Sequence, residues 1–340
     1  PIFVYRLVKT GSYYFLSRPR RFGKSLLIST LEAYFQGKKE LFEGLAMEKL
    51  EKDWIKRPVL HIDLNIGKYD TPDSLDKQLE KAVTEWEQLY GTGMAESTLA
   101  LRFAGVVRRA CEQTGQRVAI LIDEYDKPIL DNLADRETAA VMRDTLRSFY
   151  SVLKSADADL DFVLLTGVSK FSKVSLFSGL NNLRDITLDP RYSALCGYTE
   201  HDVDTVFAPE LPGLDREQIR RWYNGYNWGG TSVYNPFDVL LLFANRQFAA
   251  YWFETGTPTF LLDLLAERRF FTPDLARLQS DASLLSSFDV EHIEPEALLF
   301  QTGYLTIRSA TPATPEEEPI YTLGYPNHEV ETALNRALLP

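Results

Sequence analysis

Residues 18–27, RPRRFGKSLL, contain the residue types that bind a phosphate group. A glycine at position 23 lets the backbone approach an anion closely, and N–H groups at the start of a helix point towards it. A lysine at position 24 adds positive charge, and the hydroxyl of Ser25 is a ligand for Mg2+. The residues expected around the phosphates are Arg20, Arg21, Phe22, Gly23, Lys24, Ser25 and Leu26.

The leading half of this loop departs from the phosphate-loop pattern GxxxxGK[ST]. Arg18 stands where the first glycine is expected, and Pro19 pushes Arg18 towards extended backbone geometry. Pro19 lacks an N–H group, but it precedes the amides that would surround the phosphates. Taken alone, GKS after a strand is equally compatible with an exposed helix start.

A second motif, AILIDE at residues 119–124, places two carboxylates at the end of an apolar strand. Asp123 would hold Mg2+ through water, and Glu124 would polarise the attacking water. The carboxyl ends of parallel strands face the crevice where open α/β sheets bind ligands. A solvated acidic turn is the alternative. The order of the two motifs nevertheless predicts a site for ATP and Mg2+, with Lys24 and Glu124 as catalytic residues.

A third polar position follows the next apolar run, LLTGVSK at residues 164–170. Thr166 is expected to sense the γ-phosphate or to position water, with Ser169 behind it. A threonine that merely caps the strand end explains this position equally well.

These motifs need a sheet to bring them together, and the sequence predicts one. Apolar runs at 13–17, 58–64, 117–123 and 161–167 alternate with helical patterns at 23–35, 73–90, 96–113 and 136–154. Short apolar strands separated by helices indicate an α/β fold with a parallel sheet covered on both faces. The expected class is a P-loop NTPase sheet.

After residue 190 the pattern becomes mostly helical, with segments at 200–207, 214–224, 235–248, 258–269 and 295–301. A hairpin is expected from GYLTIRS at 303–309 and PIYTLGY at 319–325. The expected domains are a P-loop ATPase core (1–190), a helical lid or winged-helix-like region (191–290) and a linker with the hairpin (291–340). Both ends of the sequence look cut, so a longer protein is expected.

Composition excludes several classes of protein. The net charge of −11 argues against nucleic-acid binding by bulk electrostatics, although Arg18, Arg20 and Arg21 form a local basic cluster. The two cysteines, Cys111 and Cys196, form no CxxC pair, so neither a disulfide framework nor a zinc site is expected. No apolar run approaches the length of a membrane span. We expect a soluble, cytoplasmic protein.

Together these stretches resemble the AAA-ATPase-like domain family, found widely in bacterial proteins. The resemblance also includes LFSGLNNLRDITLD, LCGYTEHDV, WYNGYNWGG, VYNPFDVL and YWFETG, and it covers roughly residues 5 to 265. It implies that RPRRFGKS is this family's own form of the phosphate loop. It also implies nucleotide-binding and hydrolysis roles for Lys24, Ser25, Asp123 and Glu124, and a strand order with the phosphate-loop strand beside the Thr166 strand.

The resemblance further implies a helical lid at GYT and WYNGY, and a nuclease-like domain of the PD-(D/E)XK type beyond PNHEV. Arg184 or Arg191 could serve as an arginine finger. The aromatic residues of WYNGYNW (222–228) could stack on adenine or pack the lid. The absence of an NKxD motif favours ATP over GTP.

Three functions remain open from the sequence. The first is an ATPase whose hydrolysis drives a conformational switch. The second is a nucleotide-gated interaction module with negligible hydrolysis, or a regulator of an associated nuclease-like domain. The third is a nucleic-acid-binding regulator that uses the basic cluster, which the acidic net charge disfavours.

Overall fold

The structure is a computed structural model that describes residues 2–170, 176–177, 180, 182–256, 275, 278–281, 285, 294–311 and 319–338. The chain divides into two compact units. Unit 1 comprises residues 1–16, 24–167 and 172–185, and unit 2 comprises residues 17–23, 168–171 and 186–340. The domain boundaries expected near residues 190 and 290 stay a prediction. The helix expected at 258–269 lies outside the described residues.

Unit 1 is an α/β unit built on a parallel sheet, as the sequence predicts. Its strands are β1 (Tyr13–Ser17), β2 (Val59–Asp63), β3 (Val118–Asp123), β4 (Leu160–Gly167) and β5 (Arg184–Asp185). Among the described residues they form a five-stranded sheet in the order β2-β3-β4-β1-β5. The expected position of the phosphate-loop strand, β1, beside the Thr166 strand, β4, is confirmed.

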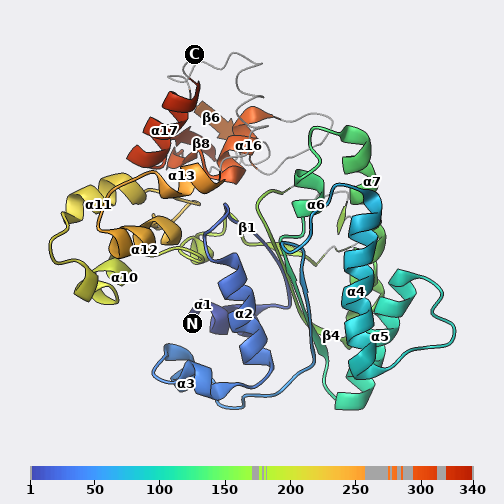
Figure 1. The fold of residues 1–340 in the computed structure, drawn as a ribbon. Helices are drawn as coiled ribbons and strands as arrows, with labels where there is room; N and C mark the ends of the chain where they lie inside the picture. Colours follow the sequence, from blue (N-terminus) through green and yellow to red (C-terminus); the bar gives the residue numbers. More distant parts are fainter. Residues whose placement is uncertain are drawn as a thin grey trace. The chain divides into compact units, whose positions relative to one another are not determined.

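The helices of unit 1 lie on both faces of this sheet. They are α1 (Ile2–Thr10), α2 (Lys24–Phe35), α3 (Ala46–Leu50), α4 (Pro72–Tyr90), α5 (Leu99–Thr114), α6 (Lys127–Leu130), α7 (Arg136–Tyr150) and α8 (Val152–Ser155), with short 3-10 turns at Lys39–Phe42 and Asp157–Asp159. Helix α2 lies on one face, and α4, α5 and α7 cover the other (Figure 1). Every residue of β1 and β3 is buried, as continuous apolar strands between two helical layers should be.

The limits of these helices follow from their capping residues. Helix α5 begins at the Thr98 side chain, which accepts a hydrogen bond from the Leu101 amide, and it ends at Gly115 in the left-handed conformation. The helix expected at 136–154 is divided at Ser151 into α7 and α8. Helix α1 was not expected from the sequence. It has nine residues, of which Val4 and Leu7 are buried, and an apolar pattern this short does not identify a helix.

Unit 2 contains helices and a small antiparallel sheet. Among its described residues the helices are α10 (Glu200–Thr205), α11 (Arg216–Tyr223), α12 (Pro236–Asn245), α13 (Tyr251–Gly256), α16 (Pro295–Thr302) and α17 (His328–Leu338), with 3-10 turns at Pro190–Tyr192 and Ala208–Glu210. Strands β7 (Thr306–Ala310) and β8 (Ile320–Gly324) pair antiparallel, which confirms the expected hairpin, and β6 (Leu278–Asp281) pairs with β8.

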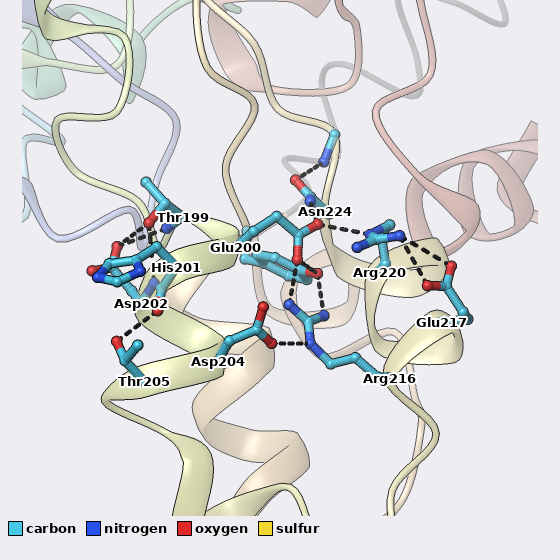
Figure 2. Close-up of polar contacts among 12 residues, drawn as sticks. Thr199, Glu200, His201, Asp202, Asp204, Thr205, Arg216, Glu217, Arg220 and Asn224 are labelled. Carbon is cyan, nitrogen blue, oxygen red and sulfur yellow. Dashed lines mark hydrogen bonds and ion pairs between the residues drawn. The ribbon is translucent and has the colours of Figure 1, made fainter.

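A charged network joins α10 to α11 within unit 2 (Figure 2). Thr199 and Asp202 form a capping box at the start of α10. The Glu200 carboxylate accepts hydrogen bonds from Arg220 Nε at 2.8 Å and from Asn224 Nδ2 at 2.7 Å. Arg216 donates to the same carboxylate, so this network fixes the two helices against each other.

Candidate nucleotide site

Lys24 and Glu124 meet at the carboxyl edge of the unit 1 sheet. Lys24 is the first residue of α2, and Glu124 follows the last residue of β3. Lys24 Nζ lies 2.9 Å from Glu124 Oε1, and the two side chains are 2% and 14% exposed. The fold therefore brings the lysine of the first motif onto the glutamate of the second, although a hundred residues separate them in sequence.

Asp123 and Thr166 form the second contact at this edge. Thr166 Oγ1 donates a hydrogen bond to Asp123 Oδ1 at 2.6 Å, and both side chains are fully buried. Their strands are paired in parallel, with Ile122 opposite Leu165. The hydroxyl holds one oxygen of the carboxylate in place, and a contact of this kind would orient the carboxylate if it bound a metal ion.

Backbone geometry after β3 sets the direction of Glu124. This residue has φ of 54°, in the left-handed region that non-glycine residues rarely adopt. The Tyr125 amide then donates to the Thr166 carbonyl at 2.9 Å. A side chain at Gly167 would collide with the Tyr125 ring at 2.6 Å, so a glycine is needed where the chain passes this close.

The phosphate loop turns immediately before α2. Gly23 has φ of 89°, and apart from its chain neighbours no atom of the described residues lies within 4 Å of a Cβ atom built on it. The loop therefore leaves open space beside a helix start, whose first N–H groups have no partner within the helix. Ser25 and Leu26 are exposed on the first turn.

In the arginine-rich part of the loop, the side chains of Arg21 and Phe22 contact aromatic rings. The guanidinium of Arg21 lies 4.3 Å from the Phe237 ring centroid, and the Phe22 ring packs at 4.7 Å from that of Tyr226. Phe22 could therefore offer a phosphate only its backbone, whereas the Arg20 side chain is exposed. Arg18 is fully buried.

The donor set suits a magnesium nucleotide better than an independent metal centre. Within the described ranges, no group of three or more His, Cys, Asp and Glu side chains is placed to hold a metal ion. Mg2+ in phosphate-transfer sites is bound by one or two protein groups together with the phosphates of the substrate. The hydroxyl of Ser25 and the carboxylate of Asp123 are of that kind.

The remaining predicted candidates are the two arginines of the finger prediction and the aromatic residues at 222–228. Arg191 is engaged with its near neighbour Asp189, with Nη2 at 2.6 Å from Oδ2, and Arg184 lies in β5 opposite Tyr14. In WYNGYNW, Tyr226 and Trp228 are 1% and 4% exposed, which supports packing over adenine stacking. No helix in the described part of the chain has the length and apolar character to cross a bilayer.

Sequence reasoning missed the partners of the leading half of the loop. Trp252 Nε1 donates to the Arg20 carbonyl, 232 residues away in sequence. Contacts this distant leave no local signal in a single sequence.

Comparison with known proteins identifies a family for this chain. A family model described as Predicted AAA-ATPase matches residues 2–177, which include Lys24, Ser25, Asp123, Glu124 and Thr166. A curated relative, "Uncharacterized protein in vnfD 5'region" from Azotobacter chroococcum mcd 1, is 55% identical over 338 residues. The alignment covers 99% of this chain and 65% of the relative, so the chain spans less than two thirds of the relative's length.

Proposed function

The chain belongs to the AAA-ATPase-like family of predicted AAA-ATPases, and from this premise we propose that it binds ATP with Mg2+ at the carboxyl edge of the unit 1 sheet and hydrolyses it. The observation that carries the proposal is the Lys24–Glu124 ion pair beside the Asp123–Thr166 hydrogen bond. A lysine, two carboxylates and a hydroxyl at the strand ends, next to a helix start, are the groups that phosphoryl transfer to water requires.

Each residue then has a distinct role. Lys24 and the amides around Gly23 bind the β- and γ-phosphates, and Ser25 and Asp123 would hold Mg2+, which when bound would neutralise charge on the phosphates. Glu124 orients the attacking water, and Thr166 fixes Asp123.

The ion pair also links binding to hydrolysis. While Lys24 contacts Glu124 at 2.9 Å, the glutamate carboxylate is engaged by the ammonium group. Phosphate oxygens compete for the same ammonium group, and their binding releases the carboxylate for water. This competition couples ATP binding to activation of the site.

The same contact favours one alternative, a nucleotide-gated interaction module with negligible hydrolysis. If the Lys24 ammonium group stays paired with the Glu124 carboxylate after ATP binds, this carboxylate is not available as the general base for the attacking water. Nucleic-acid binding through the basic cluster is less well supported, because Arg18 is buried and Arg21 lies over Phe237.

The process coupled to the ATP cycle is also a proposal. Because the relative is longer than this chain, we propose that hydrolysis drives a conformational switch that regulates a further domain, of the nuclease-like type implied by the resemblance. We place the protein in the cytoplasm.

Equilibrium binding of Mg-ATP and steady-state phosphate release test the proposal. Lys24→Ala should lose ATP binding, whereas Lys77→Ala, at an exposed lysine paired with Asp73 on α4, should bind as the wild type does. Phosphate release by the wild type supports the ATPase. Binding without release supports the gated module, and equal binding by Lys24→Ala and the wild type would place the nucleotide elsewhere.

A further inference from the structure

Arg18, in the place of the usual glycine, is a buried structural centre of the loop. Its side chain is fully buried, and its guanidinium lies 4.1 Å from the Trp228 ring centroid. It donates hydrogen bonds to backbone carbonyls at 2.9–3.3 Å, those of Ser17, Thr187, Tyr192 and Leu195. The rigid fork of an arginine can hold several carbonyls at fixed directions, which a lysine ammonium group cannot.

Two further contacts fix the residues that follow. Trp252 Nε1 donates to the Arg20 carbonyl at 3.0 Å. The Phe22 ring packs edge-on against Tyr226 and Trp228, at centroid distances of 4.7 and 5.5 Å. The backbone from residue 18 to residue 22 is thus held by side chains and carbonyls from three separate segments of unit 2.

The boundary between the units falls inside the phosphate loop. Residues 17–23 belong to unit 2, and unit 1 resumes at residue 24. The Gly23–Lys24 peptide bond therefore joins a loop shaped by unit 2 to the lysine and helix of unit 1. In a glycine-initiated loop the shape comes from backbone freedom, whereas here it comes from the Arg18 contacts.

We propose that Arg18 is the positioning residue of the phosphate loop, and that through it ATP binding stabilises the unit 2 segments at 187–195 and 226–228. The proposal rests on the function proposed above. The carbonyl contacts set the direction of the loop amides, so phosphates bind tightly only while those segments are in place. Coupling of this kind is reciprocal. The free energy by which the ordered unit 2 segments strengthen ATP binding equals the free energy by which bound ATP stabilises those segments.

Hydrogen exchange of the full 340-residue chain, with and without Mg-ATP, tests the coupling. In the wild type, Mg-ATP should slow exchange in α2 and also at residues 187–195 and 226–228. Arg18→Lys keeps the charge but loses the fork. It should weaken ATP binding about tenfold, the size of effect expected from losing charge-assisted hydrogen bonds, and should abolish the slowing at 187–195.

Arg216→Lys is the matched control in unit 2. Arg216 also lies over a ring, at 5.2 Å from the Tyr234 centroid, and contacts Glu200 and Asp204 (Figure 2). This substitution should reduce the stability of unit 2 while leaving ATP affinity within about twofold of the wild type.

A second pair of variants covers the case in which Arg18→Lys does not fold. Trp252→Phe removes the indole N–H that holds Arg20, and Trp222→Phe is its control at a ring that packs on Tyr223 and Phe248. Only Trp252→Phe should weaken ATP binding.

The outcomes separate the two proposals. Equal loss of affinity in Arg18→Lys and Arg216→Lys would mean that only general stability matters, and would overturn the positioning role. If Mg-ATP slowed hydrogen exchange in the wild type only in α2, the coupling would be overturned but the proposed ATP site would not. No binding of Mg-ATP at all would overturn both.

Discussion

Replacing Thr166 by valine tests the contact that holds Asp123. Valine keeps the shape of threonine but removes the hydroxyl that donates to Asp123 Oδ1 at 2.6 Å. Both side chains are fully buried, so water cannot replace the lost donor. A buried hydrogen bond to a charged group contributes about 1.5–3 kcal/mol, and we expect Thr166→Val to destabilise unit 1 by about 2 kcal/mol.

A double-mutant cycle isolates this interaction from other effects of the substitution. Asp123→Asn keeps an oxygen acceptor but removes the charge, so Thr166→Val in that background should cost about 1 kcal/mol, as for a neutral hydrogen bond. Thr166→Ser keeps the hydroxyl and should lose only the contribution of one buried methyl group, about 1 kcal/mol.

Native-state hydrogen exchange of the β3 and β4 amides is the appropriate assay, because it reports the stability of these strands independently of unit 2. Thr166→Val should also raise the Mg2+ concentration needed for ATP turnover by about tenfold or more, as loss of a second-sphere partner does. Equal destabilisation by Thr166→Val in the wild-type and Asp123→Asn backgrounds would refute the reasoning.

Three further predictions concern pH and the loop. The hydrogen bond between His61 and Glu32 raises the pKa of His61 above its ordinary 6.5 and lowers that of Glu32 below 4.5. This pair therefore stabilises unit 1 most between these two ordinary values, and its contribution falls as pH rises through the raised pKa of His61. His61→Gln should therefore weaken the dependence of the urea unfolding midpoint on pH above 6.5. Burial raises the pKa of Glu329 to about 7 beside the equally buried Asp238, and the resulting stability is lost as pH rises from about 4.5 towards 7. Glu329→Gln should therefore stabilise unit 2 at about pH 8, measured by thermal melting. Gly23→Ala places a methyl group in the open space beside the loop, at a φ of 89°, and should weaken ATP binding at least tenfold with only about 1 kcal/mol loss of stability.

The sequence predicted the parts of unit 1 whose signals are local. Continuous apolar runs identified β1, β3 and β4, and the acidic pair at 123–124 marked the carboxyl end of β3, where we propose the nucleotide site. The two-residue strand β5 was missed, because Arg184 and Asp185 carry no strand pattern in the sequence, although they pair with Tyr14 and Phe15 of β1.

Side-chain contacts between residues far apart in the sequence could not be predicted from the sequence. Nothing near Arg18 indicates that its guanidinium is buried among carbonyls at 187, 192 and 195. The arginine was identified as a departure from the glycine pattern, but its contacts depend on where the chain returns 169 residues later. The left-handed backbone at Glu124 and the close approach of Gly167 to Tyr125 likewise have no signal in the local sequence.

Phosphate release by wild type and Glu124→Gln, measured at saturating Mg-ATP, tests the central claim most directly. The substitution keeps the size of the side chain and frees the Lys24 ammonium group from its carboxylate partner, so ATP should bind at least as tightly as to the wild type. Turnover should fall by about a hundredfold or more, the usual effect of losing a general base. Wild-type turnover in Glu124→Gln would contradict the assignment of Glu124, and no phosphate release by the wild type would contradict the ATPase itself.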